Sequence, residues 1–352
     1  MANIKNTDLT SVREKELENC SYVKTFLMAA VVLYHSLLFW TGNWFTSNPA
    51  IEASPLGVLA SWLNTFHIYG FTLVSGYLFY YLKHECGKYS QFLPYLKKKV
   101  QRLLIPYFFV AIFWVIPIDC LWRDMEVSLV IRRFLLGTSP SQLWFLLMLF
   151  LVYTFAWPIS DFLSKHDVLS GIICIACYGI GLVGSLLLPN IFQIWTACMY
   201  FVFFVLGFKI RQHGSRILMK IPALVWLAFS LILFSCHLLL QGKESAIIRI
   251  IDLGLTFAGN LVGAAMAFAS FQKLAAKLSE KGRRAVKKLA KFSMPIYLFH
   301  QQIIYLLIFL LNGMISPYLH VWINFAGALI LSAALSAILM KFRPTRFLIG
   351  EK

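Results

Sequence analysis

Charged side chains are scarce in this sequence, and acidic ones are the scarcest. Asp, Glu, Lys and Arg make up 13% of the 352 residues, about half the share found in soluble domains. Apolar residues make up 59%, and they include 31 Phe, 15 Tyr and 10 Trp. This composition excludes an ordinary soluble domain. The long apolar runs predict a polytopic membrane protein instead.

The sequence also lacks the signals of cleavage, disulfide bonding and metal binding. No small-x-small site follows the first apolar run, which ends at Trp40, so we interpret this run as a retained helix. Three of the seven cysteines, Cys174, Cys177 and Cys198, lie inside apolar runs, a placement typical of helix packing rather than of a disulfide framework. No two histidines have the i, i+4 spacing of a metal site, so no metal is predicted.

Ten apolar segments each approach the ~20 residues that a helix needs to cross a bilayer. They predict an all-α fold, a polytopic transmembrane helical bundle of about ten spans. Residues 1–21 are expected to form an N-terminal segment, residues 22–340 the transmembrane domain, and residues 341–352 a C-terminal tail. The predicted spans are 22–40, 57–81, 103–119, 141–160, 168–188, 192–208, 221–240, 250–270, 292–311 and 319–340.

Basic residues fall almost entirely on one side of these spans. Counted on alternate sides, 27 of the 32 Lys and Arg lie on the side of the N-terminus and 5 on the other. The positive-inside rule therefore places both termini in the cytoplasm, with the protein in the plasma or inner membrane. This topology explains the net charge of +17, so no nucleic-acid partner is predicted and the lipid bilayer is the expected surrounding.

Two basic runs allow two interpretations. The runs are 97-KKKVQR-102 and 281-KGRRAVKKLAK-291. They can serve topology and attract anionic lipid. They can also form a docking surface for a polyanionic cytosolic donor, such as the phosphates of coenzyme A. The two interpretations do not exclude each other.

Ionisable residues inside predicted spans are functional candidates, because burying them in hydrocarbon is unfavourable. Three are histidines: His35 in the first span, His67 in the second and His300 in the ninth. Asp252 lies near the outer end of the eighth, and the polar but uncharged Asn260 lies deeper in the same helix. A histidine titrates near neutral pH and can act as a general base, so proton transfer is the predicted use of such residues.

The first span, 24-KTFLMAAVVLYHS-36, carries a lysine and a histidine on nearly one face. Eleven helical steps from Lys24 to His35 come to about 20° past three full turns, and to ~16 Å along the axis. Lys24 is thus placed at the cytoplasmic rim and His35 beyond mid-membrane. Topology alone could explain Lys24, as a snorkelling lysine. His35 could instead hydrogen-bond to a neighbouring helix.

Two further features of the spans leave alternatives open. His67 is predicted at a depth near that of His35, so the two could share a site. Ser75-Gly76 could supply a nucleophile, but a small pair that lets helices approach closely is the favoured interpretation. His237 falls near the outer end of its span and is interpreted as interfacial.

Six stretches, in order, resemble the acyltransferase family 3 proteins, which are membrane acyltransferases that modify surface polysaccharides. The Lys24-x10-His35 spacing resembles the family's basic-x10-His signature. The other five are 66-FHIYGFTLVSGYLF-79, 102-RLLIPYF-108, 143-LWFLLMLF-150, 201-FVFFVLGFKI-210 and 293-SMPIYLFHQ-301. Three positions depart from the family pattern: Lys24 stands where Arg is more usual, Ser21 where Asp is frequent, and Gln142 where His is common.

The resemblance implies transfer of an acyl group, most simply acetyl, from cytosolic acyl-CoA to a hydroxyl of a surface glycan or its lipid-linked precursor. It assigns His35 as general base or transient acyl carrier, with His67 and His300 as supporting polar residues. The residues that it implies for binding the phosphates of the acetyl-CoA donor are Lys24 and Arg102. Lys98 and Lys99, in the basic run 97–102, are predicted to bind the donor with them.

The sequence alone also allows two other functions. A stripe of Lys and His through a bundle could be a transport pathway for a proton, a glycan or an acyl intermediate, although we find no internal repeat of the kind that transporters often show. The chain could also be a non-catalytic member of a polysaccharide-synthesis complex, and such partners are expected in either case.

Overall fold

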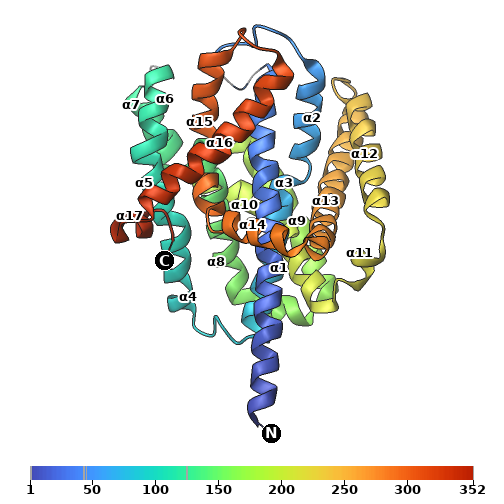
Figure 1. The fold of residues 1–352 in the computed structure, drawn as a ribbon. Helices are drawn as coiled ribbons and strands as arrows, with labels where there is room; N and C mark the ends of the chain where they lie inside the picture. The colour runs from blue at the N-terminus through green and yellow to red at the C-terminus, as the bar shows by residue number, and fades with distance from the viewer. Residues whose placement is uncertain (1, 43, 45, 124–125, 352) are drawn as a thin grey trace.

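The computed structural model describes residues 2–42, 44, 46–123 and 126–351, and the described chain consists of helices joined by loops (Figure 1). The α-helices are α1 (Ala2–Leu37), α2 (Ser54–Asn64), α3 (His67–Tyr80), α4 (Phe92–Lys99), α5 (Ile105–Val110), α6 (Ile116–Arg123), α7 (Val127–Val130), α8 (Trp144–Lys165), α9 (Asp167–Leu187), α10 (Ile194–His213), α11 (Arg216–Lys220), α12 (Ala223–Leu240), α13 (Ala246–Lys277), α14 (Glu280–Ala290), α15 (Ser293–Leu311), α16 (Pro317–Leu339) and α17 (Arg343–Leu348). The predicted all-α fold is confirmed.

Nine helical segments in the described chain are long and apolar enough to cross a membrane. They coincide with nine of the ten predicted spans, which makes the protein a multi-pass membrane protein. The remaining predicted span, 57–81, is divided between α2 and α3, and neither of these is among the nine. The helix breaks at Thr65–Phe66.

Side chains at this break add hydrogen bonds to carbonyl groups in the last turn of α2. The Thr65 hydroxyl donates to the Trp62 carbonyl at 2.7 Å, and the His67 ring nitrogen Nδ1 donates to the Leu63 carbonyl at 2.8 Å. Such bonds replace the missing turn of the helix. Gly263 of α13 leaves room for the break, since a Cβ atom there would lie 2.7 Å from the Thr65 carbonyl oxygen.

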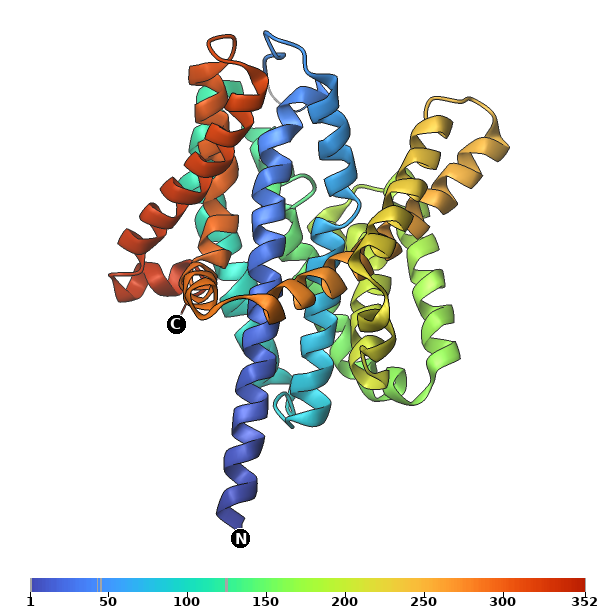
Figure 2. The ribbon, with the colours of Figure 1, turned by 45° about the vertical axis from the view of Figure 1, so that its right-hand side comes forward.

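Helix α1 runs through the middle of the bundle, with α3, α13, α15 and α16 packed around it (Figures 1 and 2). The closest helix pair is α3 with α10. A Cβ atom added at Gly76 would overlap the Phe204 carbonyl oxygen, and one added at Gly207 would overlap the Leu73 carbonyl oxygen. This reciprocal contact confirms that Gly76 is part of a close helix approach.

The predicted span 103–119 begins earlier than expected. It belongs to a helical rod that runs from Phe92 to Arg123 and contains π-helical turns at Val100–Leu104 and Ala111–Val115. Each turn precedes a proline, Pro106 or Pro117, which lacks the backbone N–H needed for a regular ladder. The first turn carries Arg102 and directly follows Lys99.

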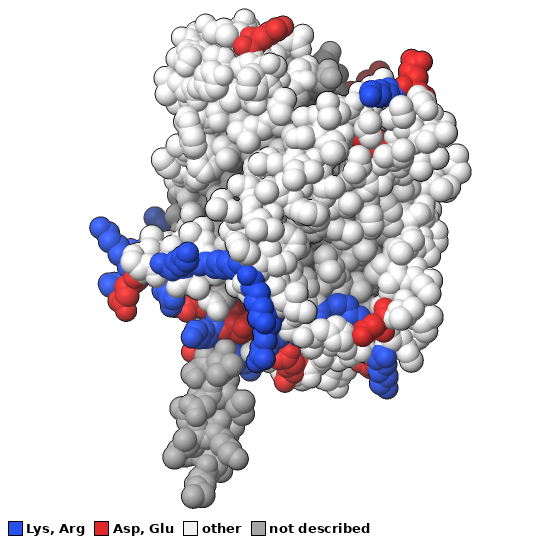
Figure 3. All heavy atoms as spheres, turned by 90° about the vertical axis from the view of Figure 1, so that its right-hand side faces the viewer, with Lys and Arg blue, Asp and Glu red and all other residues white. Residues whose placement is uncertain are grey.

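Lys and Arg gather in the lower half of the molecule in Figure 3. We call this half, which carries α4, α14 and α17, the basic end. Helix α14 contains the predicted basic run 281–291, has no buried residue, and packs across α1 (Figures 1 and 2). Its charged face is therefore free to meet lipid headgroups or an anionic molecule.

Candidate active site

Two histidines from distant parts of the chain meet at the last turn of α1. The Nδ1 atom of His35 lies 3.1 Å from the Nε2 atom of His300, and the ring centroids are 4.8 Å apart. His300 is fully buried, whereas His35 is only partly buried. The structure therefore brings together two of the three histidines that the sequence singles out.

Backbone carbonyls determine which ring nitrogen carries the proton. The Nδ1 atom of His35 faces the Val31 carbonyl at 2.9 Å, and that of His300 faces the Tyr297 carbonyl at 2.8 Å. A carbonyl oxygen can only accept a hydrogen bond, so both neutral rings carry their proton on Nδ1. The His35 N–H is then shared between Val31 and the Nε2 lone pair of His300. This leaves the Nε2 atom of His35 as the basic nitrogen.

His67 is held in the same way and lies close by. Its Nδ1 donates to the carbonyl at the helix break described above, and its ring is 1% exposed. Tyr34 joins the two sites, because its ring centroid is 4.4 Å from that of His67 and 5.0 Å from that of His35. All three predicted histidines thus belong to one cluster.

A cavity of about 430 Å³ opens on the basic end of the bundle. We call it the basic cavity. Four of its lining residues are cations: Lys24, Lys99, Arg102 and Lys291. The described residues that line it include a single carboxylate, Glu351. Positive charge focused in a cleft with apolar walls attracts anions, so the cavity suits a phosphate-bearing molecule.

Lys99 is held over a group of aromatic rings in this cavity. Its Nζ atom lies 3.3 Å from the ring centroid of Tyr153, 5.3 Å from that of Tyr95 and 5.5 Å from that of Tyr89. Cation–π contacts of this kind orient an ammonium group without neutralising it. In the described part of the chain, neither Lys99 nor Lys24 forms an ion pair, so both are available to bind an anion.

The other two predicted donor-binding residues lie differently. Arg102 lines the basic cavity and is 3.9 Å from the Glu351 carboxylate. Burial raises the pKa of Glu351, and the neighbouring Arg102 opposes this shift. Lys98 is exposed and is not among the residues that line the cavity.

Two positions that depart from the family pattern also lie at the site. Ser21 lines the basic cavity beside Lys24, so no carboxylate stands at the position where an Asp is frequent. Gln142 is buried against α15, where its amide donates to the Leu298 carbonyl at 3.0 Å and to the Gln302 side chain at 2.7 Å. Gln142 thereby supports the helix that carries His300.

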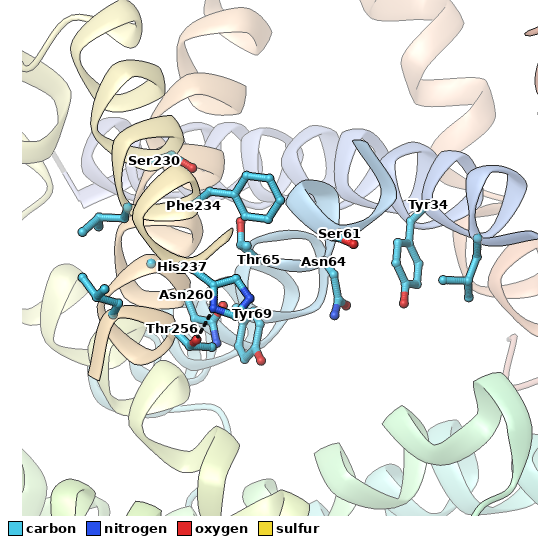
Figure 4. A pocket seen from close by; sticks show the side chains of 14 residues that line it. Tyr34, Ser61, Asn64, Thr65, Tyr69, Ser230, Phe234, His237, Thr256 and Asn260 are labelled. Carbon is cyan, nitrogen blue, oxygen red and sulfur yellow. Dashed lines mark hydrogen bonds between the residues drawn. The ribbon is translucent and has the colours of Figure 1, made fainter. Parts of the chain in front are cut away.

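A second cavity, of about 250 Å³, is shown in Figure 4, and it meets the histidine cluster at Tyr34. We call it the outer cavity. Its lining includes Tyr34, Asn64, His237 and Asn260. His237 was interpreted from the sequence as interfacial, but its ring borders this cavity and its Nδ1 atom bonds to Asp252 at 2.7 Å. The sequence contained a signal for this pair, because His237 and Asp252 lie on either side of the loop that joins two successive spans.

No metal site accompanies these cavities in the part of the chain that the structure describes: no group of three or more His, Cys, Asp or Glu side chains there could hold an ion.

These features define a helical membrane protein with a cluster of three histidines and a basic cavity. A family profile described as an acyltransferase domain matches residues 18–341, nearly the whole chain. The chain therefore belongs to acyltransferase family 3, and it is a membrane acyltransferase. Neither a curated protein nor a solved structure gives a significant match.

Proposed function

We propose that the protein transfers an acetyl group from cytosolic acetyl-CoA to a hydroxyl of a surface polysaccharide or its lipid-linked precursor, in the plasma or inner membrane. The observation that carries this proposal is the His35–His300 pair. Neither ring lines a cavity, but His35 contacts Tyr34 of the polar outer cavity and His300 contacts Tyr297 of the basic one. This arrangement supports entry of an anionic donor from one side and of a neutral acceptor from the other.

In the proposed reaction, His35 acts as the general base. Its Nε2 atom takes the proton from the acceptor hydroxyl as the oxygen attacks the thioester carbonyl. The C–O bond forms, the C–S bond breaks, and the same proton passes to the departing CoA sulfur. The positive charge that develops on His35 is stabilised by its Nδ1–H, which faces both the Val31 carbonyl and His300.

The donor's phosphates would bind in the basic cavity. Lys24 and Lys99 line this cavity and form no ion pair in the described chain. Arg102 also lines it, beside the Glu351 carboxylate. The acyl end would then point toward α15, where Tyr297 lines the same cavity and its ring lies 6.1 Å from that of His300. One helical turn thus separates the donor cavity from the histidine pair.

The test is transfer of label from labelled acetyl-CoA into surface glycan by membranes that contain the protein. We expect His35→Ala to reduce this transfer by a factor of about 10²–10⁴, the usual contribution of a general base. His166→Ala, a change at the end of α8 outside both cavities, is the control and should transfer normally.

Absence of label from the glycan with the wild-type protein would rule out the proposed reaction. If label stayed in CoA while glycan export changed, the transporter interpretation would replace it, and the broken helix α2–α3 would then be read as part of a transport pathway.

A further inference from the structure

The outer cavity has the chemistry of a site for a neutral, hydroxyl-rich molecule. None of the described residues that line it is Lys, Arg, Asp or Glu. Its walls instead combine hydroxyl groups, carboxamides and aromatic rings, which together offer hydrogen bonds and flat apolar surface. The basic cavity at the opposite end has four cations, so the two cavities select for different charges.

Two carboxamides in the outer cavity have no hydrogen-bond partner in the described chain. These are Asn64, which is exposed at the end of α2, and Asn260 on α13, which is only 6% exposed. Both amides are free to bond to a molecule in the cavity. Figure 4 shows Asn64 and Tyr34 directed into the same space that Asn260 borders. A ligand bound there would satisfy these groups.

His237 borders the cavity, and Asp252, which does not line it, holds the imidazole ring from behind. The His237 Nδ1–H donates to the Asp252 carboxylate at 2.7 Å. The Thr256 hydroxyl lies 3.3 Å from the same nitrogen (Figure 4). The carboxylate accepts only, so it holds the imidazole proton on Nδ1 and leaves Nε2 as an acceptor. His237 can thus receive a hydrogen bond from a hydroxyl of a ligand in the cavity.

We infer that the outer cavity binds the acceptor as an uncharged sugar unit, with Asn260 and the His237–Asp252 pair holding its hydroxyls. Tyr34 forms the near wall and touches His35, so it orients the hydroxyl to be acylated toward the base. The inference rests on the proposed function, and it adds the position of the acceptor and its lack of charge.

Gly259 offers a way to fill the cavity without disturbing the backbone. It lies on α13 in the cavity wall, and a Cβ atom there would meet nothing closer than a Leu233 side-chain atom at 3.9 Å. Gly259→Leu therefore projects into the space of the ligand. Gly254 on the same helix has nothing within 4 Å and does not line the cavity, so Gly254→Leu is the matched control.

The experiment titrates two substrates separately. The donor is labelled acetyl-CoA, and the acceptor is surface glycan deacylated with mild alkali, taken from cells that lack the protein. We expect Gly259→Leu and His237→Ala to raise the KM for glycan at least tenfold while the KM for acetyl-CoA stays within twofold. His213→Ala removes a histidine paired with Asp167 at the basic end, outside both cavities, and should change neither value.

Several outcomes would overturn the inference. A KM for glycan within twofold of wild type in both cavity variants would do so. A parallel rise in both KM values would indicate general damage rather than loss of an acceptor site. The charge claim is tested by competition: hexyl glucoside should compete with glycan, and hexyl glucuronide at least tenfold more weakly, so equal competition would refute it. Failure of the wild-type protein to label glycan counts against the proposed function instead.

Discussion

The Nε2 atom of His300 accepts a hydrogen bond from the Nδ1–H of His35 at 3.1 Å, although 265 residues separate the two along the chain. His300 is itself fixed by the Tyr297 carbonyl at 2.8 Å. The result is a ring that can neither rotate nor offer its own N–H to His35. His300 is therefore a positioning residue that orients the proposed base.

This relationship predicts a selective effect of changes at His300. His300→Ala should lower kcat about tenfold, since one hydrogen bond to a group that becomes charged is worth about 1.5–3 kcal/mol and the Val31 carbonyl still accepts. The KM for acetyl-CoA should not change. His300→Gln, which keeps an acceptor, should recover part of the loss. A fall in kcat that Gln does not relieve would show that His300 acts by packing alone.

Neighbouring lysines should differ sharply in donor binding. Lys99 projects into the basic cavity over three tyrosine rings, whereas Lys98 is exposed outside it. We expect Lys99→Met to raise the KM for acetyl-CoA about tenfold or more, because a charge-assisted hydrogen bond to phosphate is lost. Lys98→Met should stay within twofold. Equal effects of the two changes would point to surface charge rather than to a specific contact.

Donor binding should depend on pH through Glu351. Burial raises the pKa of this carboxyl, so it takes up a proton at a higher pH than an exposed glutamate does. Lowering the pH then removes the single carboxylate among the described cavity residues, and the KM for acetyl-CoA should fall. Titration of the donor's own phosphates changes the KM for acetyl-CoA equally in wild type and Glu351→Gln. The difference between the two KM values therefore reports the effect of Glu351.

At about pH 8, Glu351→Gln should therefore have a lower KM for acetyl-CoA than wild type. At about pH 5.5 the two KM values should be closer together. This comparison is made on the same membranes with labelled acetyl-CoA. A constant ratio of the two KM values across the pH range would dissociate Glu351 from donor binding.

The close approach of α3 and α10 predicts where the fold tolerates least change. Gly76→Ala would place a methyl group against the Phe204 carbonyl, and overpacking of this kind typically destabilises by about 1–3 kcal/mol or more. We expect a lower yield of monodisperse protein and a lower melting temperature in detergent. Gly179→Ala, where a Cβ atom meets nothing within 4 Å, is the control. Equal melting temperatures would show that the helices can separate.

The sequence alone determined the class of fold and one stripe of the site. Long apolar segments and scarce charge require helices in a membrane, because backbone polar groups in lipid must bond within their own segment. Lys24 and His35 could be placed on one face because helical geometry is regular over eleven residues. The same regularity placed His67 near His35 in depth, and the structure finds both beside Tyr34.

The tertiary structure decided the pairings and the shape of the cavities. No local pattern in the sequence indicates that 57–81 breaks at Thr65, since the break depends on space left by Gly263 in a different helix. The contact of His300 with His35, the burial of Lys99 among tyrosines and the exposure of Lys98 all depend on how helices rotate against one another. Side chains from separate helices set that rotation together, so hydrophobic patterning within one segment cannot determine it.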